Sequence, residues 1–424
     1  MPLKLVVISA WLSRVITAIV GIFSLRILNA QLPPSEYSIY IIIIGIAGWF
    51  SIIGDPGVGY STQNQISQKN ISKESYSLDI LNAYILLISL ALFICLVIYP
   101  MKNEAANYLF DKISLENRNN LGLTLWYSAT AFSMTAAFIV SNKFLYATGK
   151  GYIGNLSTSC ASIISLLILI LGIETSENKI IFSVLSTTLP LLCLSMMLAL
   201  RQIISSWKSK HLLNLKAIVF TMKNAKGFFI FNLVAAGVVQ IDYLVMSQKI
   251  SSIEIVQYYN IAKIFGIVAA INQALLYAIW PNFTMQFFEK NFKLIKKNIL
   301  KIAISTAFLT FGTTIFLSLV SNYLELFFQS NTSIFYRKSV IFSFGLVVIL
   351  RCFVDPYAIF LQSIDKTRQL IIIAAIQAPI CILLEWVLST FFSIEGILLG
   401  LGLSSVLTAS WMIPYVANRK LANY

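Results

Sequence analysis

Charged residues are scarce in this sequence. Only 11% of its 424 residues are Asp, Glu, Lys or Arg, against about 25% in an average soluble domain. A soluble protein of this length needs a more polar surface than that, whereas a lipid bilayer favours apolar faces. The hydrophobic fraction of 58% and the mean hydropathy of +0.81 agree. The composition therefore indicates an integral membrane protein and excludes a disordered chain, a disulfide-stapled secreted domain and a soluble nucleic-acid binder.

Histidine and cysteine, two common metal-binding residues, are also few. The one histidine, His211, lies in a basic stretch, and the five cysteines lie in apolar runs without a CxxC pair. This spacing favours neither a zinc site nor a disulfide framework. The sequence also lacks a Walker A motif. We therefore expect no metal, no cofactor and no ATP hydrolysis, so any transport would be driven by an ion gradient, a substrate gradient or consumption of the product.

Apolar runs of about 20 residues or more, long enough to cross a bilayer, recur along the whole chain. The first run has no signal-peptide cleavage pattern, so we expect it to be a retained helix. The runs lie at 4–31, 37–60, 77–100, 119–147, 152–173, 179–201, 218–248, 253–280, 297–321, 337–362, 368–391 and 394–417. The predicted fold is an all-α integral membrane protein with about twelve transmembrane helices.

Lysine and arginine are distributed unevenly over the predicted loops. If both termini are cytoplasmic, and cations near the ends of spans are counted with the adjoining segments, twenty of the 31 Lys and Arg are inside, seven are outside and four lie deep within spans. Such a bias follows the positive-inside rule and places both termini in the cytoplasm. The net charge of +14 is therefore a topology signal and does not indicate a nucleic-acid partner. The basic cluster at 290–301 could also contact anionic lipid headgroups.

The largest break between spans is the basic stretch 202–217, which divides the predicted spans into six and six. Two halves with even numbers of spans have the same orientation, as in transporters with parallel repeats. We therefore predict an N-terminal lobe at 1–201, a cytoplasmic linker at 202–217 and a C-terminal lobe at 218–424, arranged pseudo-symmetrically around a central cleft.

Four cations lie deep within predicted spans, where a charged side chain costs about 3 kcal/mol or more on insertion scales. Arg14 and Arg26 lie in the first span and Lys263 in the eighth. They could form a positive track that binds an anionic group, or each could neutralise a buried acid. Arg351 precedes Asp355 by four residues on one predicted helix, so these two are expected to pair. Pro356 is expected to kink or break that helix.

The candidates for ion coupling or gating are Asp55, Asp242, Arg351 and Asp355. Asp55 follows Gly54 in a Pro- and Gly-containing segment, which predicts a broken or capped helix end. Asp242 lies at about the depth of Arg26, so the two could close an outer gate as an ion pair. Glu385 is expected to lie close enough to the outer interface to reach water.

The predicted outside loops are short, the longest being near 101–118 and 322–336. A membrane glycosyltransferase or polymerase usually needs larger polar loops or clustered carboxylates. We therefore expect a transporter and not an enzyme.

Three stretches of the sequence, together with the twelve-span layout, carry a family resemblance. They are 14–40 with its LPPSEYSIY ending, GDPGVG at 54–59 followed by Asn64-Gln65-Ile66, and Gln240-Ile241-Asp242-Tyr243 with 257–263 and Trp280-Pro281. On these residues the sequence resembles the O-antigen unit flippases and related polysaccharide exporters, within the superfamily that includes the MATE drug exporters and the lipid II flippases. It departs from the family pattern at Ser38, where Gly is frequent, and at Asp55-Pro56-Gly57, where Asp-Leu-Gly is common.

The resemblance implies two six-helix lobes that open alternately to each side of the bacterial inner membrane. It implies that the partner is an undecaprenyl-diphosphate-linked oligosaccharide, moved from the cytoplasmic to the periplasmic leaflet, with membrane lipids and the polysaccharide polymerase or other assembly proteins as further partners. A diphosphate favours Arg and Lys, so Arg14, Arg26 and Lys263 are the expected contacts.

Two alternatives remain open. A cation-coupled multidrug exporter of the MATE type would be expected to bind its substrate through buried acids, but the first span carries two arginines and no acid. An O-antigen polymerase is the enzymatic alternative, which the short outside loops disfavour. Aromatic side chains near the predicted cleft could stack on sugar rings, although packing or interface anchoring is the commoner role; they include Trp11, Trp49, Tyr243 and Tyr258.

Overall fold

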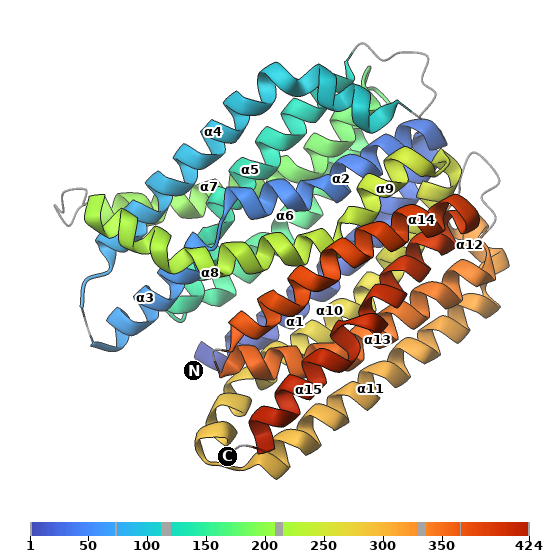
Figure 1. Ribbon diagram of the computed structural model, residues 1–424. Coiled ribbons are helices and arrows are strands. Elements are labelled where there is room, and N and C mark those ends of the chain that lie inside the picture. Colours follow the sequence, from blue (N-terminus) through green and yellow to red (C-terminus); the bar gives the residue numbers. More distant parts are fainter. Residues whose placement is uncertain are drawn as a thin grey trace. The chain divides into compact units, whose positions relative to one another are not determined.

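The computed structural model describes residues 2–72, 74–111, 120–207, 215–328, 336–364 and 366–422, and all regular secondary structure in these ranges is α-helical (Figure 1). The chain divides into two compact units, Met1–Leu233 and Val234–Tyr424. The fold class predicted from the sequence, an all-α membrane protein, is confirmed. The lobes and linker predicted at 1–201, 202–217 and 218–424 stay a prediction, and residues 208–214, including His211, lie outside the described residues.

The N-terminal unit is organised around one helix with small buried side chains. Helix α5 contacts α2, α3, α4, α6 and α7, because residues such as Ala129, Ser133 and Ala137 are fully buried and let neighbouring backbones approach closely. Tyr84 packs edge-on against Phe144 in this core. The helices are α1 (Pro2–Gln31), α2 (Pro34–Gly54), α3 (Val58–Ser72), α4 (Ser77–Phe110), α5 (Leu121–Ala147), α6 (Gly151–Gly172), α7 (Lys179–Trp207) and α8 (Leu215–Val239).

The C-terminal unit is arranged around α13, which contacts α10, α11, α14 and α15. Phe344 of α13 stacks on Phe265 of α10, with 5.9 Å between the ring centroids. The helices are α9 (Ile241–Lys249), α10 (Ser252–Phe288), α11 (Phe292–Leu319), α12 (Ser321–Phe328), α13 (Lys338–Ser363), α14 (Thr367–Leu407) and α15 (Ala409–Ala422). Helix α13 continues through Pro356, so a break there, one of the two outcomes expected from the sequence, is not found.

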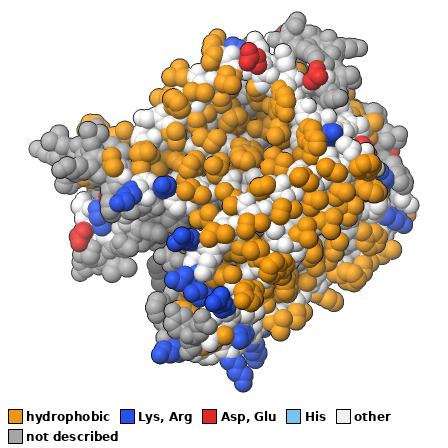
Figure 2. Space-filling model, in the orientation of Figure 1, with side chains coloured by type: hydrophobic (Ala, Val, Ile, Leu, Met, Phe, Trp, Pro, Cys, Tyr) orange, Lys and Arg blue, Asp and Glu red, His pale blue; other side chains and the backbone are white. Residues whose placement is uncertain are grey.

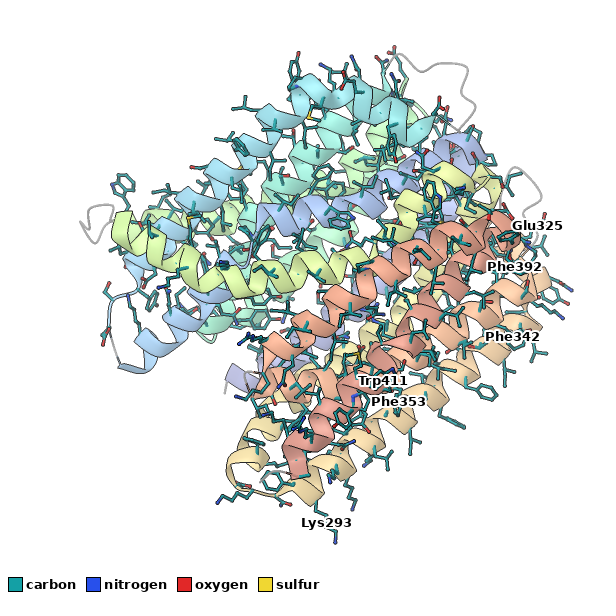
Figure 3. All side chains as sticks on the ribbon, in the orientation of Figure 1. Lys293, Glu325, Phe342, Phe353, Phe392 and Trp411 are labelled. Atoms are coloured by element: carbon teal, nitrogen blue, oxygen red, sulfur yellow. The ribbon has the colours of Figure 1, made fainter. Side chains whose placement is uncertain are left out.

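Large apolar side chains cover the outside of these helices. Hydrophobic atoms dominate the visible face over α11, α13 and α15, and the visible Lys and Arg lie mainly around its margins (Figure 2). Figure 3 shows Lys293 and Glu325 at opposite ends of the C-terminal unit and Phe342 and Phe353 on α13 between them. Phe308 and Leu319 of α11 are 77% and 74% exposed. A continuous apolar surface of this extent is stable only against lipid or another apolar partner.

Helix α14 folds back on itself at Ser393. The backbone there has φ 52° and ψ −129°, outside the helical region. A Cβ on Gly396 would lie 2.1 Å from the Leu388 carbonyl oxygen, and one on Gly400 would lie 2.6 Å from the Glu385 nitrogen. Residues 385 to 388 therefore face residues 396 to 400 in an antiparallel helical hairpin. Its arms correspond to the predicted spans at 368–391 and 394–417.

The length and composition of the helices bear on the number that cross the membrane. Within the described residues, ten helices are long and apolar enough to cross a bilayer. The number becomes eleven if the bent pair in α8 and α9 is counted as one span. The segment Thr367–Ala422, which contains the α14 hairpin, is counted as a single helix. The bend of 40° falls within the single span predicted at 218–248. The count of twelve stays a prediction.

Candidate functional site

The turn between α2 and α3 is built around Asp55. Helix α2 ends at Gly54, Gly57 adopts φ 83°, and α3 begins at Val58. The Asp55 Oδ1 accepts a hydrogen bond from the Gly59 backbone N–H at 2.9 Å, which satisfies one free donor at the start of α3. The sequence correctly predicts a broken helix end here, and the structure gives Asp55 a capping role.

Lys143 of α5 binds the second oxygen of the same carboxylate. Its Nζ lies 2.7 Å from Asp55 Oδ2 and 3.5 Å from the centre of the Tyr60 ring. From the sequence alone, Lys143 counts only as one of the twenty cations assigned to the inside segments. No sequence signal identifies this pairing, because the partners are 88 positions apart. The pair joins the α2–α3 turn to α5.

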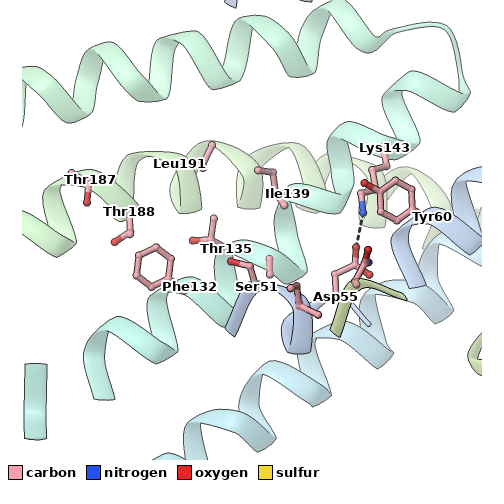
Figure 4. Close-up of a pocket in the computed structure, with 13 residues that line it drawn as sticks. Ser51, Asp55, Tyr60, Phe132, Thr135, Ile139, Lys143, Thr187, Thr188 and Leu191 are labelled. Carbon is pink, nitrogen blue, oxygen red and sulfur yellow. Dashed lines mark hydrogen bonds and ion pairs between the residues drawn. The ribbon is translucent and has the colours of Figure 1, made fainter. Parts of the chain in front are cut away.

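A cavity of about 390 Å³ opens beside this ion pair (Figure 4). It lies within the N-terminal unit, and residues of α2, α3, α5, α7 and α8 line it. Figure 4 shows that the ion pair lies at one side and the hydroxyls of Thr187 and Thr188 at the other. Its lining comprises Ser51, Ile52, Asp55, Tyr60, Phe132, Thr135, Ala136, Ile139, Lys143, Thr187, Thr188, Leu191 and Asn232.

A separate polar cluster lies inside the C-terminal unit, at the start of α9. Asp242 is only 5% exposed. The Tyr258 hydroxyl donates a hydrogen bond to Asp242 Oδ2, and the Tyr243 backbone N–H donates to Oδ1 at 2.8 Å. Tyr258 also packs on the Phe344 ring, with 4.7 Å between centroids. Tyr258 is thereby held in the interior, where it orients a carboxylate and does not offer its face to a ligand.

Glu385 belongs to this cluster. It is fully buried, and the Cys381 thiol donates to its Oε1 at 3.1 Å. Its Oε2 is buried and has no hydrogen-bond partner among the described residues. Asp242 and Glu385 are close enough to interact electrostatically, and α9 packs against α14. Our expectation that Glu385 reaches water is wrong, because the hairpin at Ser393 folds Gly400 over it.

The Arg351 and Asp355 pair predicted from the spacing is present. The Arg351 Nε lies 3.9 Å from Asp355 Oδ2. The same oxygen accepts a shorter hydrogen bond, 3.0 Å, from Gln273 of α10. Asp355 is therefore held mainly by α10, and the role indicated by its contacts is to join α10 to α13.

The three cations expected to bind an anion lie on different units. Arg14 and Arg26 are on α1, and no carboxylate in the described part of the N-terminal unit forms an ion pair with either. Arg14 is exposed and interacts electrostatically with Tyr146. Lys263, on α10 of the C-terminal unit, is exposed, with its Nζ 5.0 Å from the centre of the Tyr259 ring. The predicted ion pair of Arg26 with Asp242 joins the two units and stays a prediction.

Comparison with known proteins identifies relatives over nearly the full chain. A "Putative O-antigen transporter" of Salmonella typhimurium is 30% identical over 415 residues, which are 96% of this chain and 94% of that protein. A "Putative O-antigen export protein" of Yersinia pseudotuberculosis is 29% identical over 422 residues, 97% of this chain and 94% of that protein. No protein-family model matches the chain.

Solved structures show the same fold at much lower identity. An inward-facing multidrug resistance MATE family transporter of the MOP superfamily has a TM-score of 0.78 at 12% identity, covering 98% of each chain. The lipid II flippase MurJ, in an inward closed conformation, has a TM-score of 0.74 at 14% identity, covering 99% of this chain and 89% of that one. These likenesses establish the membrane-transporter fold.

Proposed function

We propose that this chain, which belongs to the O-antigen transporter family, is a flippase that moves an undecaprenyl-diphosphate-linked O-antigen repeat unit from the cytoplasmic to the periplasmic leaflet. The observation that carries this function is the 28–30% identity to proteins with O-antigen transporter and exporter names over 94% of their length. The chain acts as a membrane transporter and not as an enzyme.

The physical features of the chain suit such a substrate. A polyprenyl tail can remain in lipid, and the apolar outer surface of the helices contacts the same lipid. The headgroup is polar and carries a diphosphate, which requires cationic or N–H donors along its path. We propose Arg14, Arg26 and Lys263 as these diphosphate contacts. The absence of a carboxylate partner for the two arginines in the described part of their own unit supports this role.

We further propose that Asp242, together with Glu385, couples transport to a cation. Two buried carboxylates in one cluster, with no Lys or Arg paired to either among the described residues, favour binding of a proton or a metal cation. Their contacts give Asp55, Arg351 and Asp355 structural roles, and these three stay weaker candidates for coupling or gating. We keep the outer gate closed by an Arg26–Asp242 ion pair as a separate proposal. That ion pair would compete with the hydrogen bond that Asp242 accepts from Tyr258.

Replacing Asp242 with Asn, or Glu385 with Gln, is expected to lower surface polysaccharide by at least about tenfold, because each change removes a buried ionisable group at little cost in volume. Membrane abundance should stay near that of the wild type. The measurement is surface polysaccharide in a complemented deletion strain. Wild-type output from the Asp242→Asn, Glu385→Gln double variant would remove both residues from the coupling proposal.

The flippase assignment is tested by mass spectrometry of lipid-linked glycans in a deletion strain, with the leaflet assigned by accessibility to an external glycosidase or lectin. We expect single repeat units trapped on the cytoplasmic face, and restored surface polysaccharide on complementation. Single units on the periplasmic face would instead indicate a polymerase. The MATE-like fold makes a multidrug exporter the second candidate, which would give no accumulation and new sensitivity to cationic dyes.

The cellular setting follows from the same proposal. The chain is a multi-pass membrane protein, and we propose the bacterial inner membrane as its location, with both termini in the cytoplasm. We also propose that the flipped unit passes to a polysaccharide polymerase and other assembly proteins.

A further inference from the structure

The Ser and Thr hydroxyl groups around the 390 Å³ cavity of the N-terminal unit share one property. Each donates its own hydrogen to a backbone carbonyl of the same helix. Ser51 donates to Ala47 at 3.0 Å, Thr135 to Ala131 at 2.7 Å, and Thr188 to Val184 at 2.8 Å, while Thr187 donates to the Ser183 and Val184 carbonyls at 3.1 and 2.8 Å. A hydroxyl has one hydrogen and two lone pairs. These side chains can therefore only accept hydrogen bonds from an occupant.

The charge of the cavity is balanced. Asp55 and Lys143 are the ionised side chains in its lining, and they pair with each other at 2.7 Å. A phosphate or carboxylate needs hydrogen-bond donors and a positive field. This lining offers a lysine neutralised by Asp55, and Ser and Thr hydroxyls whose hydrogens are already used. An anion is therefore poorly matched to it.

A neutral polyol fits the same lining. Sugar hydroxyls can each donate to a fixed acceptor, and the Asn232 side-chain amide can both donate and accept. Figure 4 shows the Phe132 ring beside Thr135 and Thr188, and an aromatic face suits the C–H face of a sugar ring. The volume of about 390 Å³ lies in the range of small-ligand sites.

We infer that this cavity is a saccharide subsite. It binds one or two sugars of the oligosaccharide through their hydroxyl hydrogens, separately from the cations that contact the diphosphate. This inference rests on the proposed function, which supplies the saccharide.

The test removes two acceptors without changing side-chain shape. In Thr135→Val with Thr188→Val, each hydroxyl becomes a methyl group, and the helices keep their own backbone bonds. Thr124→Val is the matched control, because Thr124 is also a buried α5 hydroxyl, donating to Asn120 at 2.9 Å, but it does not line the cavity. Thr135→Ser with Thr188→Ser keeps both acceptors.

The measurement is titration calorimetry of the full chain in detergent, with the oligosaccharide released by mild acid from the host strain's lipid-linked repeat unit. We expect the Val double variant to weaken binding by about tenfold, from the loss of two hydrogen bonds, and the Ser double variant and Thr124→Val to bind like the wild type. Equal thermal stability of all variants is the folding control.

Two results would overturn the inference. One is unchanged oligosaccharide affinity in the Val double variant, and the other is a wild type that does not bind the oligosaccharide. Inorganic pyrophosphate, titrated in parallel, should bind the wild type and the Val double variant alike, and a selective loss in the variant would mean an anion site. If the wild-type chain restores surface polysaccharide in the deletion strain, the flippase function stands, and the results above count only against the saccharide subsite.

Discussion

Gly396→Ala is expected to reduce the amount of protein in the membrane by at least about tenfold. The added Cβ would lie 2.1 Å from the Leu388 carbonyl oxygen and 2.7 Å from the Ser389 nitrogen. Both contacts are to backbone, so no side chain can rotate away, and the arms of the α14 hairpin must separate. Overpacking of this kind costs about 1–3 kcal/mol or more, a large part of the usual margin of stability.

The measurement is size-exclusion chromatography of a fluorescently tagged chain extracted from membranes. Gly402→Ala is the control, because a Cβ at that position meets only Val347, at an ordinary contact distance of 3.5 Å. It should elute and accumulate like the wild type. If Gly396→Ala behaves as Gly402→Ala does, the arms are not packed as described.

Arg14→Ala combined with Lys263→Ala is expected to abolish surface polysaccharide while the protein stays in the membrane. A hydrogen bond to a charged group contributes about 1.5–3 kcal/mol, so losing two diphosphate contacts should slow transport by a hundredfold or more. Both side chains are exposed, so neither substitution opens a cavity in a packed core. Stability should therefore change little.

The readout is polysaccharide at the cell surface, normalised to membrane abundance. Lys293→Ala provides a control, because Lys293 is an exposed cation near the start of α11, at the end of the C-terminal unit (Figure 3). It should leave export unchanged. Full export in both single variants, Arg14→Ala and Lys263→Ala, would remove these residues from the proposed site.

The fold class and two local features could be predicted from the sequence. Scarce charge and repeated apolar runs specify a helical membrane protein, because a bilayer requires every backbone group to be satisfied within helices. The Pro and Gly residues after Asp55 predict the broken helix end. The spacing of four residues predicts the contact of Arg351 with Asp355. Each of these signals is local in the sequence.

The remaining site features depend on long-range packing. Lys143 and Asp55 meet because α5 passes the α2–α3 turn, and nothing near either residue in the sequence indicates this. Glu385 is buried because Ser393 reverses the chain, although a serine has no special preference for a positive φ. At Pro356 the helix continues even though proline lacks a donor, and packing around α13 outweighs this local preference.

The hairpin at Ser393 also bears on how the chain enters the membrane during synthesis. Lys366 precedes Ser393 by 27 residues and Lys420 follows it by 27; Arg368 lies two residues after Lys366, and Arg419 directly precedes Lys420. Each end of the hairpin therefore carries two cations, which resist transfer across the bilayer. The two arms can then insert as one unit, with both of these ends retained on the same side of the bilayer.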